Sequence, residues 1–312
     1  MAPSAGRGRR ARPGAGYAGS HWRARGRAGG LTLELLDFVL LCAAAFATAV
    51  LSAVVGMAGG ITLLAAMLLW LPPLVVIPLH GVIQLASNGS RTWFQRRHAR
   101  FDILWRYALL LLPGGLAGLA VARSLPEEGL RAAIAGFVLL ATWVPVARAR
   151  WRASRRAGVR ADVAAGDGGG AAAGGKRGAA EGGEGAGGTA QLWRRFLPLG
   201  AAAGFLNVTI GAVGPLIAPF FLNIGLRRQA LVGTKAACQT LGHLVKLAIF
   251  GGAGFAFHEH LPLLVGACLC VLAGTWLGSR LLERASESLF IALYRGVLTL
   301  IALRLAGSAL LA

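Results

Sequence analysis

The chain has 312 residues, of which 56% are hydrophobic and 14% are charged, and its mean hydropathy is +0.63. A soluble domain of this length needs far less apolar surface, so the composition excludes an ordinary soluble protein and favours a membrane protein. The formal net charge of +20 suggests nucleic acid at first sight, but 17 of the 32 Lys and Arg residues lie in 1–30 and 148–195, outside the apolar segments. Such basic clusters are typical of cytoplasmic segments that contact anionic membrane lipid, so we expect no nucleic-acid partner.

The predicted elements start after residues 1–30, which we expect to be a disordered, arginine-rich arm. Apolar segments long enough, or nearly so, to cross about 30 Å of hydrocarbon as helices lie near 31–55, 73–95, 103–122, 130–147, 229–250, 261–282 and 288–306. Shorter apolar pieces lie near 59–71, 196–210 and 215–224, and each adjoins a glycine cluster. Such pieces are typical of half-helices or re-entrant turns, whose backbone lines a cavity or is buried in protein.

A Gly/Ala-rich stretch at 149–193 separates two apolar halves, 31–148 and 194–312. Its central part, 161–190, is almost entirely Gly and Ala with scattered charges, and it cannot bury enough apolar area to offset the entropy lost on ordering. We therefore predict a flexible cytoplasmic linker between the halves and assign 161–190 no structure.

The two halves carry the same polar residues in the same order. An offset of 155 residues maps Gly211 onto Gly56, Gly214 onto Gly59, Lys235 onto His80, Gln239 onto Gln84, His243 onto Asn88 and Lys246 onto Arg91 without a gap. A register kept over this distance indicates an internal repeat, and paired interrupted segments in two halves point to a transporter's binding site. The sequence therefore predicts an all-α polytopic membrane protein with two related repeats of about five helical segments each.

The charges of the loops predict how the repeats are oriented. With the linker in the cytoplasm, the acidic loop at 124–129 lies outside and the arginines of 96–100 lie inside, so the Gln84 helix runs from outside to inside. In the second half the arginines at 227–228 lie inside, so the Gln239 helix runs in the opposite direction. The repeats are thus predicted to be inverted. With five segments per half, however, the arginine-rich N-terminus lies outside, whereas arginine-rich segments usually stay on the cytoplasmic side of the membrane.

Each half places four polar residues on one face of its third helical segment, within about 80° at about 100° per residue. They are His80, Gln84, Asn88 and Arg91 in the first half and Lys235, Gln239, His243 and Lys246 in the second. Polar groups in hydrocarbon are costly and usually face a cavity or one another, which favours a functional path. The structural alternative is interhelical hydrogen bonding by the amides and snorkelling of Arg91 and Lys246 to the membrane interface.

The charge of these two stripes predicts an anionic substrate. No Asp or Glu is available in the middle of an apolar segment, which disfavours a cation carrier. Amides, Lys, Arg and the free N–H groups of glycine-broken helices donate hydrogen bonds, as an oxyanion requires. We therefore expect Gln84 and Gln239 to bind the anion directly, the cationic stripe residues to supply positive potential, and Gly59, Gly60 and Gly214 to supply backbone donors, while a histidine could carry a coupled proton.

No metal, cofactor or covalent catalysis is expected, so the sequence does not predict an enzyme. The four cysteines, all in apolar segments and without a Cys-x-x-Cys pair, are predicted to be buried structural thiols. A loop with His258 and His260 offers two metal ligands, but no further ligand is near in the sequence, so a solvated loop is predicted.

With these motifs the chain resembles the sulfite exporter TauE/SafE family, small anion permeases with two related halves. The resemblance rests on Val55–Gly60, Leu79–Arg91, Gly211–Pro219 and Val232–Gln239, and it covers about 31–148 and 194–306. It implies a multi-pass protein of the inner (plasma) membrane that moves sulfite, sulfonates or similar small organic anions. We expect alternating access between the repeats; a passive anion channel and a non-transporting scaffold are the alternatives, and homo-oligomerisation stays open.

Overall fold

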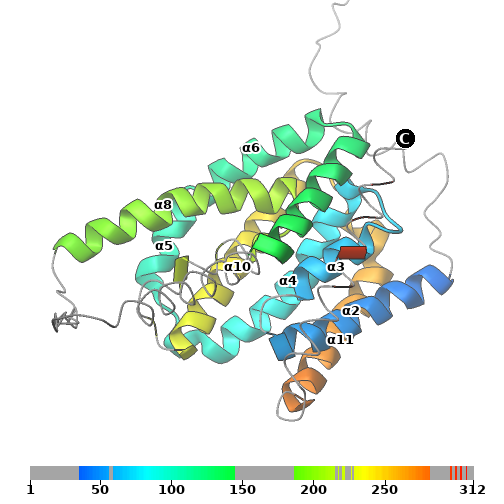
Figure 1. Cartoon of the computed structure of the whole chain (residues 1–312), viewed down its shortest axis with the longest axis horizontal. Helices are drawn as coiled ribbons and strands as arrows, with labels where there is room; N and C mark the ends of the chain where they lie inside the picture. The colour runs from blue at the N-terminus through cyan, green and yellow to red at the C-terminus, as the bar shows by residue number, and fades with distance from the viewer. Residues whose placement is uncertain are drawn as a thin grey trace, which may run out of the picture.

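The computed structural model describes residues 35–55, 59–144, 186–214, 217, 220–221, 226, 228–281, 296, 299–300, 303 and 307. All regular secondary structure in these ranges is helical (Figure 1), which confirms the all-α part of the predicted fold class. The predicted arm at 1–30, most of the predicted linker, and Gly56 and Pro215 of the repeat motifs lie outside the described residues.

The helices follow the predicted order along the chain. In the first half they are α2 (Leu35–Val55), α3 (Gly59–Met67), α4 (Pro73–Gln95), the 3-10 helix η1 (Arg96–His98), α5 (Phe101–Leu109), α6 (Leu111–Ser124) and a helical stretch at 127–144. In the second half they are α8 (Ala186–Thr209), α10 (Arg228–Gly252), the 3-10 helix η2 (Phe257–His260) and α11 (Leu261–Leu281). The described helices α2, α3, α4, α10 and α11 therefore lie where the sequence predicts them.

One predicted helix is broken in the structure. The segment predicted as a single span at 103–122 forms α5 and α6, which meet at an angle of 42°. Pro113 explains the break, because proline lacks an N–H and its ring collides with the carbonyl four residues earlier in a continuous helix. That carbonyl belongs to Leu109, the last residue of α5.

A second difference concerns the start of the second half. The sequence predicts a short piece near 196–210 and no structure at 161–190, but α8 begins at Ala186, inside that stretch. Once one end of a helix is held by packing, each further residue that joins the helix adds one backbone hydrogen bond. The helix can therefore extend into the preceding Gly/Ala-rich residues. The buried Phe196, Leu199 and Ala203 provide that anchor.

The two halves exchange helix partners. At the 155-residue offset α2 corresponds to α8 and α11 to α6, yet α2 packs against α11 and α6 against α8 (Figure 1). Gly114 and Gly118 of α6 lie so close to α8 that a Cβ at either position would collide with an α8 carbonyl, and Gly274 of α11 lies equally close to α2. In both pairs the contacting residues increase in number in the same direction along the two helices, so the two helices of each pair run parallel. Small residues that allow backbones to approach are typical of helix contacts in membranes.

Between these two pairs, α4 and α10 pack directly against each other. Thr92 Oγ1 of α4 lies 2.9 Å from Thr240 Oγ1 of α10, and Gly81 of α4 packs against the side chain of Lys246. Residue numbers fall along α10 as they rise along α4, so these two helices are antiparallel. The polar faces predicted for the two halves therefore meet at this central contact.

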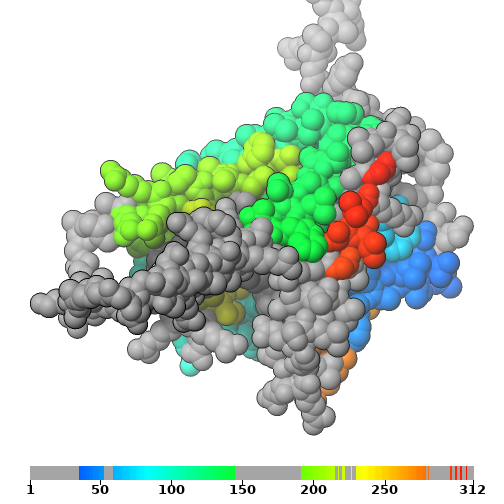
Figure 2. Space-filling model, viewed as in Figure 1, coloured from blue at the N-terminus to red at the C-terminus, as the bar shows by residue number. Residues whose placement is uncertain are grey.

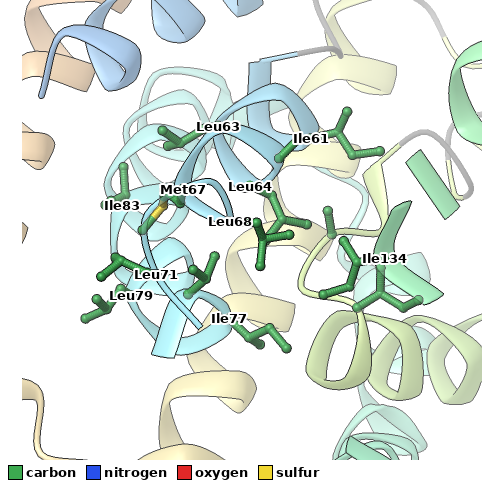
Figure 3. Close-up of a cluster of buried hydrophobic side chains, with 14 of the residues drawn as sticks. Ile61, Leu63, Leu64, Met67, Leu68, Leu71, Ile77, Leu79, Ile83 and Ile134 are labelled. Atoms are coloured by element: carbon green, nitrogen blue, oxygen red, sulfur yellow. The ribbon is translucent and has the colours of Figure 1, made fainter. Parts of the chain in front are cut away.

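The short helix α3 is held inside the protein rather than at its surface. Figure 3 shows Leu63, Leu64 and Met67 of α3 in one apolar cluster with Ile77, Leu79 and Ile83 of α4. Every residue of α3 except Gly60 is buried. A helix of nine residues is too short to cross a bilayer, and its burial satisfies the rule that interrupted backbone at membrane depth is covered by protein.

The outer faces of the helices are apolar. Large side chains are widely exposed there, for example Leu36 at 63%, Leu269 at 62% and Trp276 at 57%. Such a surface suits lipid rather than water. Figure 2 shows one face of the protein, where α8 lies beside the 127–144 helix. On the 127–144 helix, Trp143 Nε1 donates a hydrogen bond to Thr299 Oγ1 at 2.9 Å.

Within the described residues, two helices are long and apolar enough to cross a membrane, at Leu35–Ser52 and Phe257–Gly278. The bent pair formed by α5 and α6 makes a third if it counts as one span. The helices α4 and α10 also have the length of a span, but their polar stripes lower their hydropathy. The predicted spans at 73–95 and 229–250 therefore do not pass the combined criterion of length and hydropathy, and the predicted span at 288–306 lies mostly outside the described residues.

Candidate functional site

A polar pocket lies at the contact between α4 and α10, beside the start of α3 and the turn that follows α8. It is lined by Ser52, Gly60, Ile61, His80, Gln84, Asn88, Arg91, Ala212, Val213, Gly214, Lys235, Gln239 and His243. The volume open to the centres of water molecules is about 30 Å³, enough for about two waters at roughly 10–15 Å³ each. The structure thus brings together every predicted site residue except Lys246 and Gly59.

A glycine leaves room for each of the two glutamines. A Cβ placed on Gly60 would lie 3.1 Å from Gln84 Oε1, and one on Gly214 would lie 2.9 Å from Gln239 Nε2. Each glutamine amide therefore rests directly on the backbone of a broken segment, where any side chain would displace it. Both halves thus place a glycine against the glutamine amide, although the 155-residue offset aligns Gly214 with Gly59 rather than with Gly60.

Asn88 orients the Gln84 amide. Its Nδ2 donates to the Gln84 backbone oxygen at 3.1 Å and to Gln84 Oε1 at 3.3 Å. Because Oε1 is used as an acceptor, the Nε2 group of Gln84 is left as a donor for a ligand in the pocket. Asn88 thereby fixes which end of the amide a ligand meets.

Two cations line the pocket, and no carboxylate of the described part of the chain lies in the lining with them. Arg91 donates from Nη2 to Ser52 Oγ at 3.0 Å, and Lys235 is buried with 7% of its surface exposed. The lining contains no Asp or Glu, and none of the acidic residues that the structure describes is buried. The positive charge is therefore not neutralised within the pocket, and the field there attracts an anion.

Two histidines, one from each half, meet at the pocket. The rings of His80 and His243 have centroids 6.2 Å apart and lie nearly perpendicular, at 79°. His80 donates from Nε2 to the Gly60 carbonyl oxygen at 2.8 Å. Both rings are buried, and Nδ1 of each makes no hydrogen bond to the described part of the chain. Each ring therefore keeps one nitrogen for a proton or a ligand.

Lys246 lies behind the pocket rather than in its lining. It is fully buried, its stem packs against Gly81, and its Nζ donates to the Gly211 carbonyl oxygen at 3.0 Å. Gly211 has a φ of +96°, a backbone conformation that favours glycine, in the turn after α8. Lys246 thus holds the turn that carries Gly214 into the pocket, and it does not snorkel to the surface.

Gly59 has a packing role. A Cβ there would collide with the Thr48 carbonyl oxygen and with the Ser52 side chain of α2. The glycine thus allows α2 and α3 to approach closely, and this contact places Ser52 at the pocket. Ser52 was not among the predicted site residues, because α2 has the composition of a plain apolar span. One signal was available: the residue at the 155-residue offset, Asn207, is also polar within an apolar segment.

The fold and the pocket together define a class: a helical membrane protein with a cation-rich polar pocket at the contact between its two halves. The family model of the sulfite exporter TauE/SafE matches residues 41–305. The chain belongs to this family, whose members are membrane transporters rather than enzymes. No curated protein and no solved structure matches the chain significantly. The family also supports placing the protein in a membrane.

Proposed function

We propose that the protein is a multi-pass permease of the inner (plasma) membrane that carries sulfite or a related small oxyanion. The observation that carries the proposal is the pocket, where Arg91, Lys235 and the two glutamines converge and no described residue contributes a carboxylate. An oxyanion accepts hydrogen bonds at its oxygens and is attracted by both cations, whereas a metal cation would be repelled. Donors come from both halves, so the ligand bridges them.

The size of the pocket favours a small anion. A volume of about 30 Å³ for water centres matches a ligand of a few heavy atoms, such as sulfite, on the scale of roughly 10–15 Å³ for one water. An organic sulfonate with a carbon chain needs the pocket to widen. We therefore expect sulfite to bind more tightly than longer sulfonates.

Alternating access between inverted repeats is the mechanism that fits the packing best. A pseudo-two-fold axis in the membrane plane makes corresponding helices of the two repeats antiparallel, and α4 and α10 run in this way. The same axis makes the exchanged pairs, α2 with α11 and α6 with α8, equivalent to each other. Since each half supplies part of the lining, movement of one half against the other would change the side from which the pocket is reached.

Transport in proteoliposomes tests this function. Vesicles preloaded with unlabelled sulfite, kept free of oxygen so that sulfite is not oxidised, should accumulate radiolabelled sulfite by counterflow, and the rate should saturate. Sulfate, short sulfonates and short carboxylates serve as competitors. The matched control is the Gln84→Ala/Gln239→Ala double variant at the same protein-to-lipid ratio. Flux that never saturates, without counterflow, would identify a channel.

The scaffold alternative is tested with a truncated chain. Deletion of 1–28 and 161–190 removes nine of the 32 Lys and Arg residues and most of the Gly/Ala-rich sequence, including the first five residues of α8, but no residue that lines the pocket. The truncated protein should keep saturable counterflow. If the full-length protein shows no flux of any tested anion while it inserts and folds normally, the transport function is refuted.

A further inference from the structure

A second, smaller chamber adjoins the pocket on the side of the first half. Its lining includes the hydroxyl residues Thr48, Ser52 and Ser87, and it shares Ser52, Gly60 and Gln84 with the larger pocket. The volume open to water centres is about 10 Å³, close to that of a single water. The Gln84 side chain therefore lies between two spaces, a cationic pocket and a smaller chamber, here called the hydroxyl chamber, in which three hydroxyl groups face an otherwise largely apolar lining.

The corresponding place in the second half is also polar, but it is closed. The 155-residue offset maps Ser52 onto Asn207 and Ser87 onto Gly242. A Cβ placed on Gly242 would lie 3.2 Å from Asn207 Nδ2 and 3.9 Å from Tyr107 Oη. These two side chains therefore occupy the space beside α10, about one helical turn from Gln239.

Two buried polar atoms at this closed place have no hydrogen-bond partner among the described residues. Tyr107 is fully buried and Asn207 is 2% exposed, yet Tyr107 Oη and Asn207 Oδ1 make no hydrogen bond to any described residue. Orphaned buried polar atoms are rare in native proteins, because burial removes their water without replacing it. Neither side chain lines the anion pocket. Their polar atoms are therefore available to a group that arrives only when this region opens.

We propose that the hydroxyl chamber and the Tyr107–Asn207 patch are the two ends of the anion's path, on either side of the pocket. This inference rests on the proposed transport function. Tyr107 Oη donates a hydrogen bond to the passing oxyanion, and the Asn207 amide binds the anion or its water. One end has room for a water while the other is filled by side chains, an asymmetry that alternating access requires. Tyr107 and Asn207 are thus path residues that bind the anion in transit.

The Tyr107→Phe variant tests the path because it removes only Oη. Since Oη has no partner in the described structure, the variant should unfold at the same temperature as the wild type or higher. It should bind sulfite with unchanged affinity, and its maximal counterflow rate should fall about tenfold, the effect expected from losing about one hydrogen bond. Thr142→Val is the control, because it removes a buried hydroxyl bonded to the Val138 carbonyl oxygen in the 127–144 helix. A wild-type rate in Tyr107→Phe overturns the proposal.

A labelling experiment tests the same path without a measurement of transport rates. Ser87→Cys and Asn207→Cys, each in a chain whose native cysteines are replaced, are exposed to a negatively charged thiol reagent from one side of the membrane at a time. The two variants should react from opposite sides, and sulfite turnover should be needed for reaction at Asn207→Cys. Reaction of both from the same side, or none at Asn207→Cys during turnover, overturns the path. Absence of sulfite counterflow in the wild type would refute the transport function instead.

Discussion

Substitution of Gly214 by alanine tests the contact that positions one of the glutamines. The new Cβ would lie 2.9 Å from Gln239 Nε2, and an unstrained contact between heavy atoms is about 3.5 Å, so the amide must retreat by about 0.6 Å. Displacement of a positioned group by 1 Å can cost about a hundredfold. We therefore expect Gly214→Ala to weaken sulfite binding about three- to tenfold, which is about 0.7–1.4 kcal/mol.

A double-mutant cycle separates this displacement from general damage. Gln239→Ala removes a hydrogen bond to a charged ligand, which costs about 1.5–3 kcal/mol. Within the described residues, a Cβ on Gly214 meets nothing but the Gln239 side chain. Adding Gly214→Ala to Gln239→Ala should therefore cause no further loss of affinity. The assay is equilibrium binding of sulfite to purified protein, with counterflow in proteoliposomes as a second readout.

The control for this cycle is Gly136→Ala. Gly136 lies in the 127–144 helix, and a Cβ there meets no described atom within 4 Å. This variant should keep wild-type affinity and gain up to about 1 kcal/mol of helix stability. If Gly214→Ala weakens binding equally with and without Gln239, the glycine acts on something other than the glutamine, and the proposed contact does not position the amide.

Three further predictions use other parts of the structure. For topology, His98→Cys and His258→Cys, both at exposed positions in a chain without native cysteines, should be labelled from opposite sides of the membrane; labelling from one side would refute inversion. For charge, Lys246→Gln should weaken binding of a divalent anion more than a monovalent one in a competition assay, because Coulomb attraction scales with ligand charge; equal losses would leave Lys246 with only its bond to Gly211. For packing, Gly204→Ala places a Cβ against the α6 backbone and should lower stability by about 1–3 kcal/mol in thermal unfolding; an unchanged melting temperature would contradict the close contact.

The spacing of polar residues was enough to predict most of the pocket. A helix turns by a fixed angle per residue, so the positions of Gln84 and Gln239 alone determine which residues share their faces. The sequence also contained the cause of the break between α5 and α6, since Pro113 cannot continue a regular helix. That break stayed unpredicted because the surrounding segment is apolar enough to read as one span.

The rest of the pocket depends on contacts between helices, which spacing along one helix does not encode. Ser52 reaches the pocket because Gly59 lets α3 lie against α2. Lys246 shares the predicted face, but it bonds to the turn at Gly211 instead of lining the pocket. These placements follow from backbone approach and from a positive φ, and neither property has a periodic signal in the sequence.

The exchange of helix partners between the halves has a consequence for how the protein is made. The ribosome synthesises α2 in the first half, but its partner α11 is made only near the end of the second half. Until then the face of α2 that carries Phe38 and Phe46 must be covered by lipid or by an assembly factor. The halves are therefore not independent folding units, and a chain stopped before α11 would leave α2 unpaired in the membrane.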